Sequence, residues 1–307
     1  MNERKYSFFL GCVMPNRFVF IEAAIRRTME ALGVTLQDMV GASCCPAPGV
    51  FRSFHEETWY ALGARNLTIA EENGCDVMTG CSGCYGTLLE VNHRLKHDAA
   101  MRAKINAHLA KIGREFRGTI DVKHVMEVYY LDLGIDRLRD ACKYEVPLNV
   151  APHLGCHIIK PSKIRPWGGE VEEPTFYAEM IEATGAQVVH YEDEFMCCGA
   201  GGALRSWTRD ASIDFSFQKL ENMVTAAEEA GKTLDAIITC CPFCHLQMDD
   251  ASKSSGRNVP VLYYSQLLGI SMGLNPYELG LVNPGVPGVP PFVPFDPILQ
   301  KLKEAGF

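Results

Sequence analysis

The sequence lacks the features that place a chain in a membrane or on a nucleic acid. Its longest apolar stretches fall well short of the eighteen or so residues that a membrane-spanning helix needs. Lys and Arg number 29 against 37 Asp and Glu, which gives a formal net charge of −8. Binding to phosphate backbones requires clustered Lys and Arg. We therefore expect no membrane span and no nucleic-acid partner.

Two further signatures are missing. The N-terminus offers a basic start and a short apolar run, but no small-residue cleavage site follows and Cys12 interrupts the run. We interpret this segment as a first strand rather than a signal peptide. No Gly-X-Gly-X-X-Gly fingerprint opens a helix after a strand, so we predict no flavin or nicotinamide site in this chain.

Cysteine, in contrast, is abundant, with thirteen residues. Without an export signal, these thiols are not expected to form structural disulfides, and metal binding or redox chemistry becomes the default expectation. Because the number of cysteines is odd, they cannot all pair in disulfides within the chain. Ten of them fall into two matching sets. The first cysteine set is Cys12, Cys44, Cys45, Cys81 and Cys84, and the second is Cys156, Cys197, Cys198, Cys241 and Cys244.

The two sets follow the same order of predicted elements, which indicates an internal duplication. Predicted strands end at the cysteines, at residues 6–10, 35–40 and 76–79 in the first half and 148–151, 187–191 and 235–239 in the second. Predicted helices lie between them, at residues 18–32, 57–72, 175–184 and 206–230. This alternation predicts an α/β fold of two similar units related by a pseudo-two-fold axis, with both sets at strand ends.

We predict three segments. An N-terminal unit with its connector spans residues 1–145, with the connector within 114–147, and a C-terminal unit spans 146–283. A Pro-rich tail covers 284–307. Its residues 285–297 should run extended before a short terminal helix, either along a partner chain or as a plain surface tail.

Five thiols per set is an informative number. Tetrahedral zinc and ordinary cubane clusters both take four cysteine ligands. A fifth thiol indicates an unusual cluster with a bridging thiolate, or a spare redox-active thiol, and adjacent Cys-Cys pairs suit a multi-iron core. Two zinc knuckles in a scaffold without redox activity remain the alternative. Cys75, Cys142 and Cys240 have no counterpart in the opposite half, and we interpret them as core or flanking residues.

The spacing Cys–X31–Cys-Cys–X35–Cys-X-X-Cys, repeated with longer gaps, resembles the duplicated cysteine-rich CCG domain. Four segments are similar to the family of B subunits of methanogen heterodisulfide reductase. They are FFLGCVMPNR around Cys12, GASCCPAPGV around Cys44, MCCGAGG around Cys197 and CPFCHLQ from Cys241. The resemblance covers about residues 5 to 280.

The resemblance implies a catalytic subunit that reduces the coenzyme M–coenzyme B mixed disulfide to two thiols. It implies two noncubane [4Fe-4S] clusters, one held by each cysteine set, that supply one electron each. Electrons would come in the cytoplasm from a ferredoxin-like C subunit and from a flavin-bearing A subunit, with a hydrogenase or formate dehydrogenase module upstream. CCG domains also serve electron transfer in hydroxy-acid oxidation complexes, which is the alternative function.

Such a substrate is anionic, and its reduction to two thiols consumes protons. Both properties predict basic residues near the cysteines. Candidate basic residues are Arg17, His153, His157, Lys160, Arg165, Arg205 and His245. His153, His157 and His245 are the predicted proton donors, because histidine titrates near neutral pH. The alternative for each is an ordinary solvated charge or a core histidine.

Overall fold

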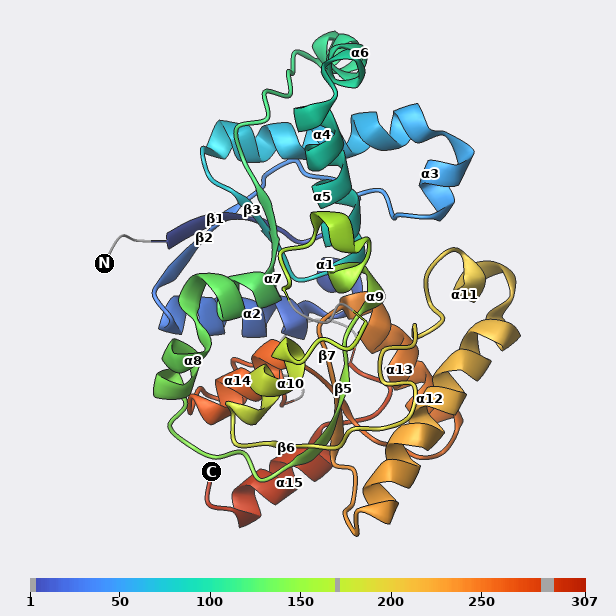
Figure 1. Ribbon diagram of the computed structural model, residues 1–307. Coiled ribbons are helices and arrows are strands. Elements are labelled where there is room, and N and C mark those ends of the chain that lie inside the picture. Colours follow the sequence, from blue (N-terminus) through green and yellow to red (C-terminus); the bar gives the residue numbers. More distant parts are fainter. Residues whose placement is uncertain (1–3, 169–171, 283–289) are drawn as a thin grey trace.

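Two parallel β-sheets, one from each half of the chain, form the framework of the computed structural model (Figure 1). The structure describes residues 4–168, 172–282 and 290–307. We call the part built on the sheet of residues 4–124 the first unit and the part built on the sheet of residues 149–263 the second unit. In Figure 1 the first sheet, in blue to green, lies above the second sheet, in light green to orange.

Each sheet has four strands in the same relative order. The first sheet runs β2-β1-β3-β4 and the second β6-β5-β7-β8, and all of these neighbours are parallel. The strands are β1 (Arg4–Phe9), β2 (Val34–Asp38), β3 (Val77–Thr79), β4 (Val122–His124), β5 (Asn149–His153), β6 (Gln187–Val188), β7 (Ala236–Thr239) and β8 (Val261–Tyr263). This confirms the predicted α/β architecture of two similar units.

Helices connect the strands. Those of the first unit are α1 (Val13–Arg17), α2 (Val19–Ala31), α3 (Val50–Phe54), α4 (Glu56–Asn73), α5 (Ser82–His97), α6 (Ala99–Leu109), η1 (Ala110–Ile112), α7 (Val125–Glu127), the π-helical η2 (Val128–Leu133) and α8 (Ile135–Ala141). Those of the second unit and tail are α9 (Cys156–Ile159), η3 (Ser162–Ile164), α10 (Phe176–Glu182), α11 (Leu204–Trp207), α12 (Arg209–Glu229), α13 (Pro242–Ser254), α14 (Tyr264–Ser271) and α15 (Asp296–Glu304).

Several elements differ from the sequence-based expectation. Helices α5, α6, α13 and α14 were not predicted, nor were two strands, and one predicted helix is divided. Strands β4 and β8 were not predicted, because each is short and no cysteine follows it to mark a strand end, whereas Cys81 and Cys241 follow the short strands β3 and β7. β4 also lies inside the stretch 114–147 that we predicted as a connector. The single helix expected over 206–230 is divided into α11 and α12, because the backbone of Thr208 leaves the helical region at φ −137° and ψ 66°.

Buried contacts hold the two units against each other. The hydroxyl of Tyr263, at the end of β8, donates to the carbonyl of Gly80 in the first unit over 2.7 Å and lies 3.2 Å from that of Cys240. A Cβ at Gly80 would approach the Tyr263 hydroxyl to 3.1 Å and Ile25 to 2.5 Å, so a side chain here would crowd the hydroxyl and displace the end of Ile25. The Tyr129 hydroxyl joins Thr28 to Ser265 at 2.6 and 2.9 Å. The carboxyl ends of the two sheets are thereby brought together.

The described part of the tail returns to the body of its own chain. The backbone N–H groups of Phe292 and Val293 donate to the Asp249 carboxylate over 2.7 and 3.0 Å. Helix α15 then buries Ile298 and Leu302, which confirms a short terminal helix. Residues 285–289 of the predicted extended segment lie outside the described residues. Among the described helices, none is both long and apolar enough to cross a membrane.

Candidate metal-cluster site

Three loops at the carboxyl edge of the first sheet bring the first cysteine set together. Cys12 precedes α1, Cys44 and Cys45 follow β2, and Cys81 and Cys84 stand at the N-terminus of α5. Hydrogen bonds with Cys12 and Cys45 lower the pKa of the Cys44 thiol to about 3. Cys45 in turn interacts with Cys84, and Cys84 with Cys81. The five thiols therefore form one continuous group.

The second cysteine set repeats this arrangement on the second sheet. Cys156 begins α9, and Cys241 and Cys244 stand at the N-terminus of α13. Hydrogen bonds with Cys156 and Cys198 lower the pKa of the Cys197 thiol to about 2. Cys198 Sγ donates to Cys244 Sγ over 3.5 Å. The chain of thiol contacts thus follows the same order in both units.

The two sets meet at one pair of residues. Cys81 Sγ and Cys241 Sγ, the corresponding cysteines of the two sets, lie 3.9 Å apart and are buried. Glycine allows the backbone to approach these sulfurs, since a Cβ at Gly11, where φ is +71°, would lie 2.7 Å from Cys84 Sγ. Cys12, Cys44 and Cys197 are exposed, whereas Cys81 and Cys241 are buried, so each group reaches the surface at the end of its chain of contacts that lies away from the junction.

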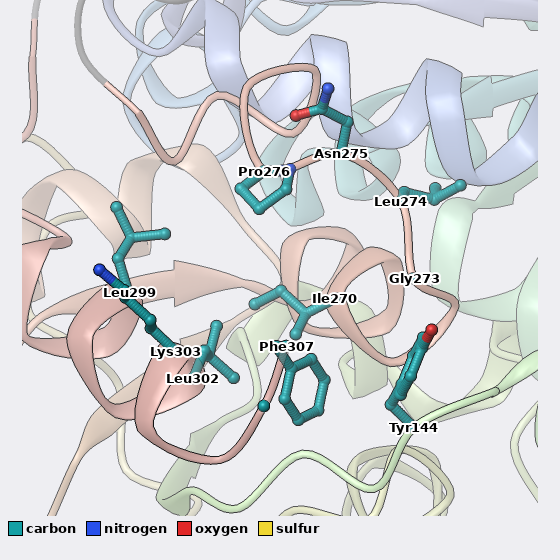
Figure 2. Close-up of a pocket in the computed structure, with 11 residues that line it drawn as sticks. Tyr144, Ile270, Gly273, Leu274, Asn275, Pro276, Leu299, Leu302, Lys303 and Phe307 are labelled. Atoms are coloured by element: carbon teal, nitrogen blue, oxygen red, sulfur yellow. The ribbon is translucent and has the colours of Figure 1, made fainter.

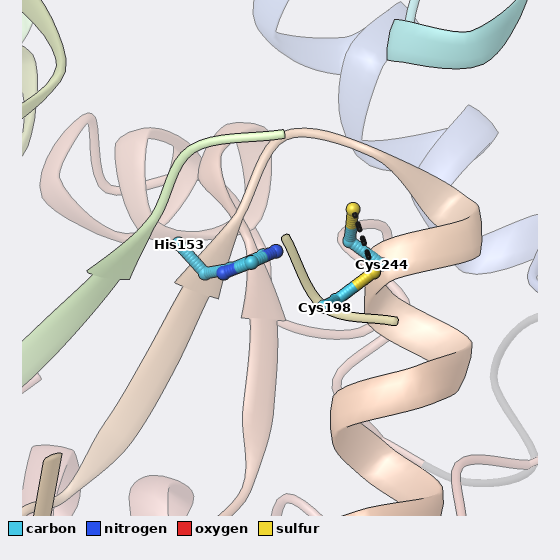
Figure 3. Close-up of side chains that lie close together, drawn as sticks. All are labelled: His153, Cys198 and Cys244. Atoms are coloured by element: carbon cyan, nitrogen blue, oxygen red, sulfur yellow. Dashed lines mark hydrogen bonds between the residues drawn. The ribbon is translucent and has the colours of Figure 1, made fainter. Parts of the chain in front are cut away.

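His153 belongs to the second group. Its ring points from the end of β5 toward Cys198 and Cys244 (Figure 3). The three ligand atoms lie within 4.8 Å of one another. His153 is 1% exposed, and neither of its ring nitrogens has a hydrogen-bond partner among the described residues. Burial lowers its pKa to about 3, so the ring is neutral at physiological pH.

These observations test whether the residues fit the expected iron–sulfur clusters. Among the described residues, which include all thirteen cysteines, no disulfide forms. Each group offers five sulfurs in contact, six of the ten cysteines are buried, and the orphaned His153 nitrogens face the second group. Buried polar groups require partners, and thiolate is the ligand that iron–sulfur clusters use. The donor set fits.

The structure places the other two predicted proton donors differently. His245 is fully buried against the rings of Phe18 and Phe20, at centroid distances of 4.7 and 5.5 Å, and burial lowers its pKa to about 3. His157 follows Cys156 and packs on α5 at Gly86. Burial lowers the pKa of His157 as well, but this residue is only half-buried. His157 is therefore the most accessible of the three.

The four predicted cations are already engaged. Arg205 binds Asp250 over 2.7 Å and Gln247 over 2.6 Å. Arg17 donates to the Pro290 carbonyl in the tail over 2.8 Å. Lys160 lies 3.7 Å from Glu172. Buried Arg165 donates to the carbonyls of His157 and Lys160, and its guanidinium lies 4.6 Å from the ring of Tyr85.

Sequence reasoning missed Lys219, a buried cation beside the second cysteine set. Its Nζ donates to the carbonyls of Asp193, Glu194 and Met196. A signal was available in the sequence, because Lys219 lies seven residues after Ser212 and three after Ser216, on the buried face of α12. A lysine on that face is unusual and calls for a partner.

A separate cavity lies at the C-terminal end of the chain. It has a volume of about 250 Å³ and is lined by apolar residues of α14 and α15 together with Tyr144 and Phe307 (Figure 2). No cysteine of either set lines it. It is therefore distinct from the thiol groups.

Comparison with known proteins agrees with the assignment of the two cysteine sets to iron–sulfur clusters. The profile of the cysteine-rich CCG domain matches residues 6–89 and 150–249. The chain is 45% identical over 283 residues to the B subunit of the ferredoxin/F420H2-dependent CoB-CoM heterodisulfide reductase of Methanosarcina acetivorans, covering 90% of this chain and 92% of that one. It is 31% identical over 288 residues to the 8-methylmenaquinol:fumarate reductase membrane anchor subunit of Wolinella succinogenes, covering 91% and 96%.

A solved structure shares the fold. The crystal structure of a hypothetical protein from Helicobacter pylori matches 92% of this chain with a TM-score of 0.65 and 14% sequence identity. The match covers 51% of that protein, so this chain spans about half its length. At this identity the match shows only that the two proteins share an arrangement of helices and strands.

Proposed function

The chain belongs to the heterodisulfide reductase B-subunit family of duplicated CCG proteins, and on that premise we propose that it reduces the mixed disulfide of coenzyme M and coenzyme B to the two free thiols. The family is one of iron–sulfur oxidoreductases. The reaction takes two electrons and two protons and breaks one S–S bond.

One observation carries the proposal, namely the 3.9 Å between Cys81 Sγ and Cys241 Sγ. A disulfide is a two-electron couple, whereas iron–sulfur groups pass single electrons. A single site would have to hold a half-reduced sulfur species until a second electron arrived. Two thiol groups that meet at corresponding cysteines offer one place to each sulfur of the substrate.

We assign the ten cysteines of the two sets as ligands of two noncubane [4Fe-4S] clusters, five to each. When bound, these clusters would supply one electron to each substrate sulfur. The fifth thiol in each contact chain supports this assignment over zinc, which takes four ligands. The exposed thiols Cys12, Cys44 and Cys197 mark the side from which a small molecule would approach.

We propose that the chain supplies the protons through its histidines. His153, His157 and His245 are the candidates, and burial lowers the pKa of each, so each is neutral near pH 7. A neutral imidazole carries one N–H that it passes on only if the ring is reprotonated from outside. The half-buried His157 meets that condition best, and buried Arg165 fixes the backbone carbonyl of His157.

We propose that electrons come from partner proteins of the kinds that the family resemblance implies, a C subunit with ferredoxin-like clusters and an A subunit with flavin. A hydrogenase or formate dehydrogenase module would lie upstream, and the complex would work in the cytoplasm. The methanogen relatives are themselves named as one subunit of a heterodisulfide reductase, which supports a multi-subunit complex.

Anaerobic analysis of the purified chain tests the proposal. We expect about eight irons and eight sulfides per chain, and oxidation of reduced viologen on addition of coenzyme M–coenzyme B disulfide. Cys142→Ser is the control, since Cys142 belongs to neither set. Zinc in place of iron would support the scaffold alternative. Cluster-loaded protein that ignores this disulfide would contradict the proposed substrate and favour a role in another oxidoreductase complex.

A further inference from the structure

The duplication allows the two thiol groups to be compared position by position. Phe9 lies three residues before Cys12, as His153 lies three before Cys156. Asn66 lies 21 residues after Cys45, as Lys219 lies 21 after Cys198. At both positions the second unit carries a nitrogen donor or a cation where the first carries a neutral residue. The two groups therefore have the same number of thiols but differ in the charges and hydrogen-bond donors beside them.

Lys219 is a charged ammonium. Its Nζ donates to three carbonyls, those of Asp193, Glu194 and Met196, over 2.9, 2.7 and 2.9 Å. An ammonium has three N–H donors and a neutral amine two, so this pattern requires the protonated form. The side chain is fully buried. Its charge interacts with Cys198 and Cys244, the two thiols that His153 faces, and also with the Glu194 carboxylate and Cys197.

In the first unit Asn66 donates to backbone carbonyls as Lys219 does in the second, but it carries no charge. Its Nδ2 donates to the carbonyls of Ser43 and Cys44 over 3.4 and 3.1 Å, as Lys219 donates to that of Met196 before the second Cys-Cys pair. The cation beside it, Arg65, donates to Asn66 Oδ1 over 3.1 Å. Arg65 is only partly buried, so water screens its charge.

His153 and Phe9 make the second difference. Both are buried at the end of the first strand of their sheets, at 1% and 0% exposure. The imidazole of His153 carries at least one N–H in either protonation state, and it has no hydrogen-bond partner among the described residues. The sulfurs of Cys198 and Cys244 lie within 4.8 Å of a ring nitrogen of His153. The Phe9 side chain has no nitrogen or oxygen atom, so it can neither donate a hydrogen bond to sulfur nor accept one.

We propose that His153 and Lys219 make the second cysteine set hold the more easily reduced of the two clusters, with His153 donating its N–H to sulfur and Lys219 adding a fixed positive charge. The inference rests on the proposed clusters but not on the proposed substrate. One electron from an external low-potential donor enters, and no bond forms or breaks. The cluster of the second set is then reduced before the cluster of the first set.

The physical basis is the added negative charge of the reduced state. Hydrogen bonds to sulfur and nearby cations stabilise that charge and raise the potential. The deeper burial of Cys156 compared with Cys12 acts in the opposite direction. The Lys219 ammonium and the His153 N–H act against this effect, and charges interact roughly fourfold more strongly near protein than in bulk water.

A reductive titration of the cluster-loaded chain, followed by electron paramagnetic resonance without any disulfide present, tests the inference. The signal that disappears in Cys244→Ser belongs to the second set. We expect that signal at the higher midpoint. His153→Phe and Lys219→Asn copy the first unit, and each should lower that midpoint by about 59 mV, which is a tenfold change for a one-electron couple. Iron content should stay unchanged.

The conservative variant His153→Gln keeps an N–H donor and should retain most of the difference. If Lys219→Asn does not fold, the two His153 variants decide alone. A higher midpoint at the first set, or unchanged midpoints in the variants, would overturn the inference. Loss of about half the iron in both His153 variants would show that His153 is a ligand and would also overturn it. Failure of the proposed substrate is separate, since it would leave the midpoints intact.

Discussion

Glu127 shows how one residue distinguishes the two units. Its carboxylate accepts the backbone N–H of His124 in the cap of α7, whereas Gln266 caps α14 at the corresponding place in the second unit. Glu127 is 5% exposed, and burial raises its pKa to about 7. A carboxyl with a raised pKa binds more protons in the folded than in the unfolded state. The contribution of Glu127 to stability should therefore fall as pH rises from 4.5 to 7.

Glu127→Gln copies the cap of the second unit and should remove this dependence. The difference in unfolding free energy between parent and variant should change by about 1–3 kcal/mol against the parent between about pH 5 and 8, because all other titrating groups, the buried histidines included, are common to both. Urea unfolding at both pH values measures it. Glu30→Gln is the control, because the Glu30 side chain is 71% exposed. A parent and variant with the same pH dependence would show that Glu127 ionises normally.

At the residue scale, the sequence predicted what depends on local spacing and missed what depends on packing. The ten cysteines could be grouped because each pair lies at a strand end, and strand ends of a parallel sheet share one edge. His153 was named for its proximity to Cys156, but the register of β5 beside β7 aims it at Cys244. Lys219 lies 21 residues from Cys198, and only the packing of α12 brings it there.

At the scale of elements, the short strands and the tail show where periodic patterns stop being informative. Longer elements such as α2 and α4 agree closely with the predicted helices. β4 and β8 depend on pairing with β3 and β7, which no local pattern encodes. The tail is similar, since its composition predicts an extended chain but not its attachment to Asp249 on α13.

Asp249→Asn should release that attachment. An amide oxygen replaces the charged acceptor for the N–H groups of Phe292 and Val293, and charge-assisted bonds of this kind are worth about 1.5–3 kcal/mol. We expect faster hydrogen exchange at Phe292 and Val293 and faster proteolysis of the tail. Asp136→Asn is the matched control, because the Asp136 side chain is 92% exposed. Unchanged exchange at both amides would mean that the burial of α15 alone holds the tail.

At the scale of the whole molecule, the duplication was predictable and the junction was not. The repeated order of strands and cysteines is written in the sequence. The bond from Tyr263 to Gly80 joins residues 183 positions apart, and the approach of Cys81 to Cys241 spans 160. Such contacts arise only when two complete units dock. Under the proposed function, this docking brings the two cysteine sets together into one substrate site.

A molecule that works through two sites should fail when either is lost. Cys84→Ser and Cys244→Ser each remove a thiol that is in contact with two others of its set. We expect each variant to keep about half the iron, one cluster of two. Disulfide turnover should fall by about 100-fold or more rather than by half, because a two-electron couple then has one single-electron site. Stopped-flow turnover normalised to iron measures this. Half activity in either variant would mean that the two sites work independently, and the 3.9 Å approach of Cys81 to Cys241 would then have no catalytic meaning.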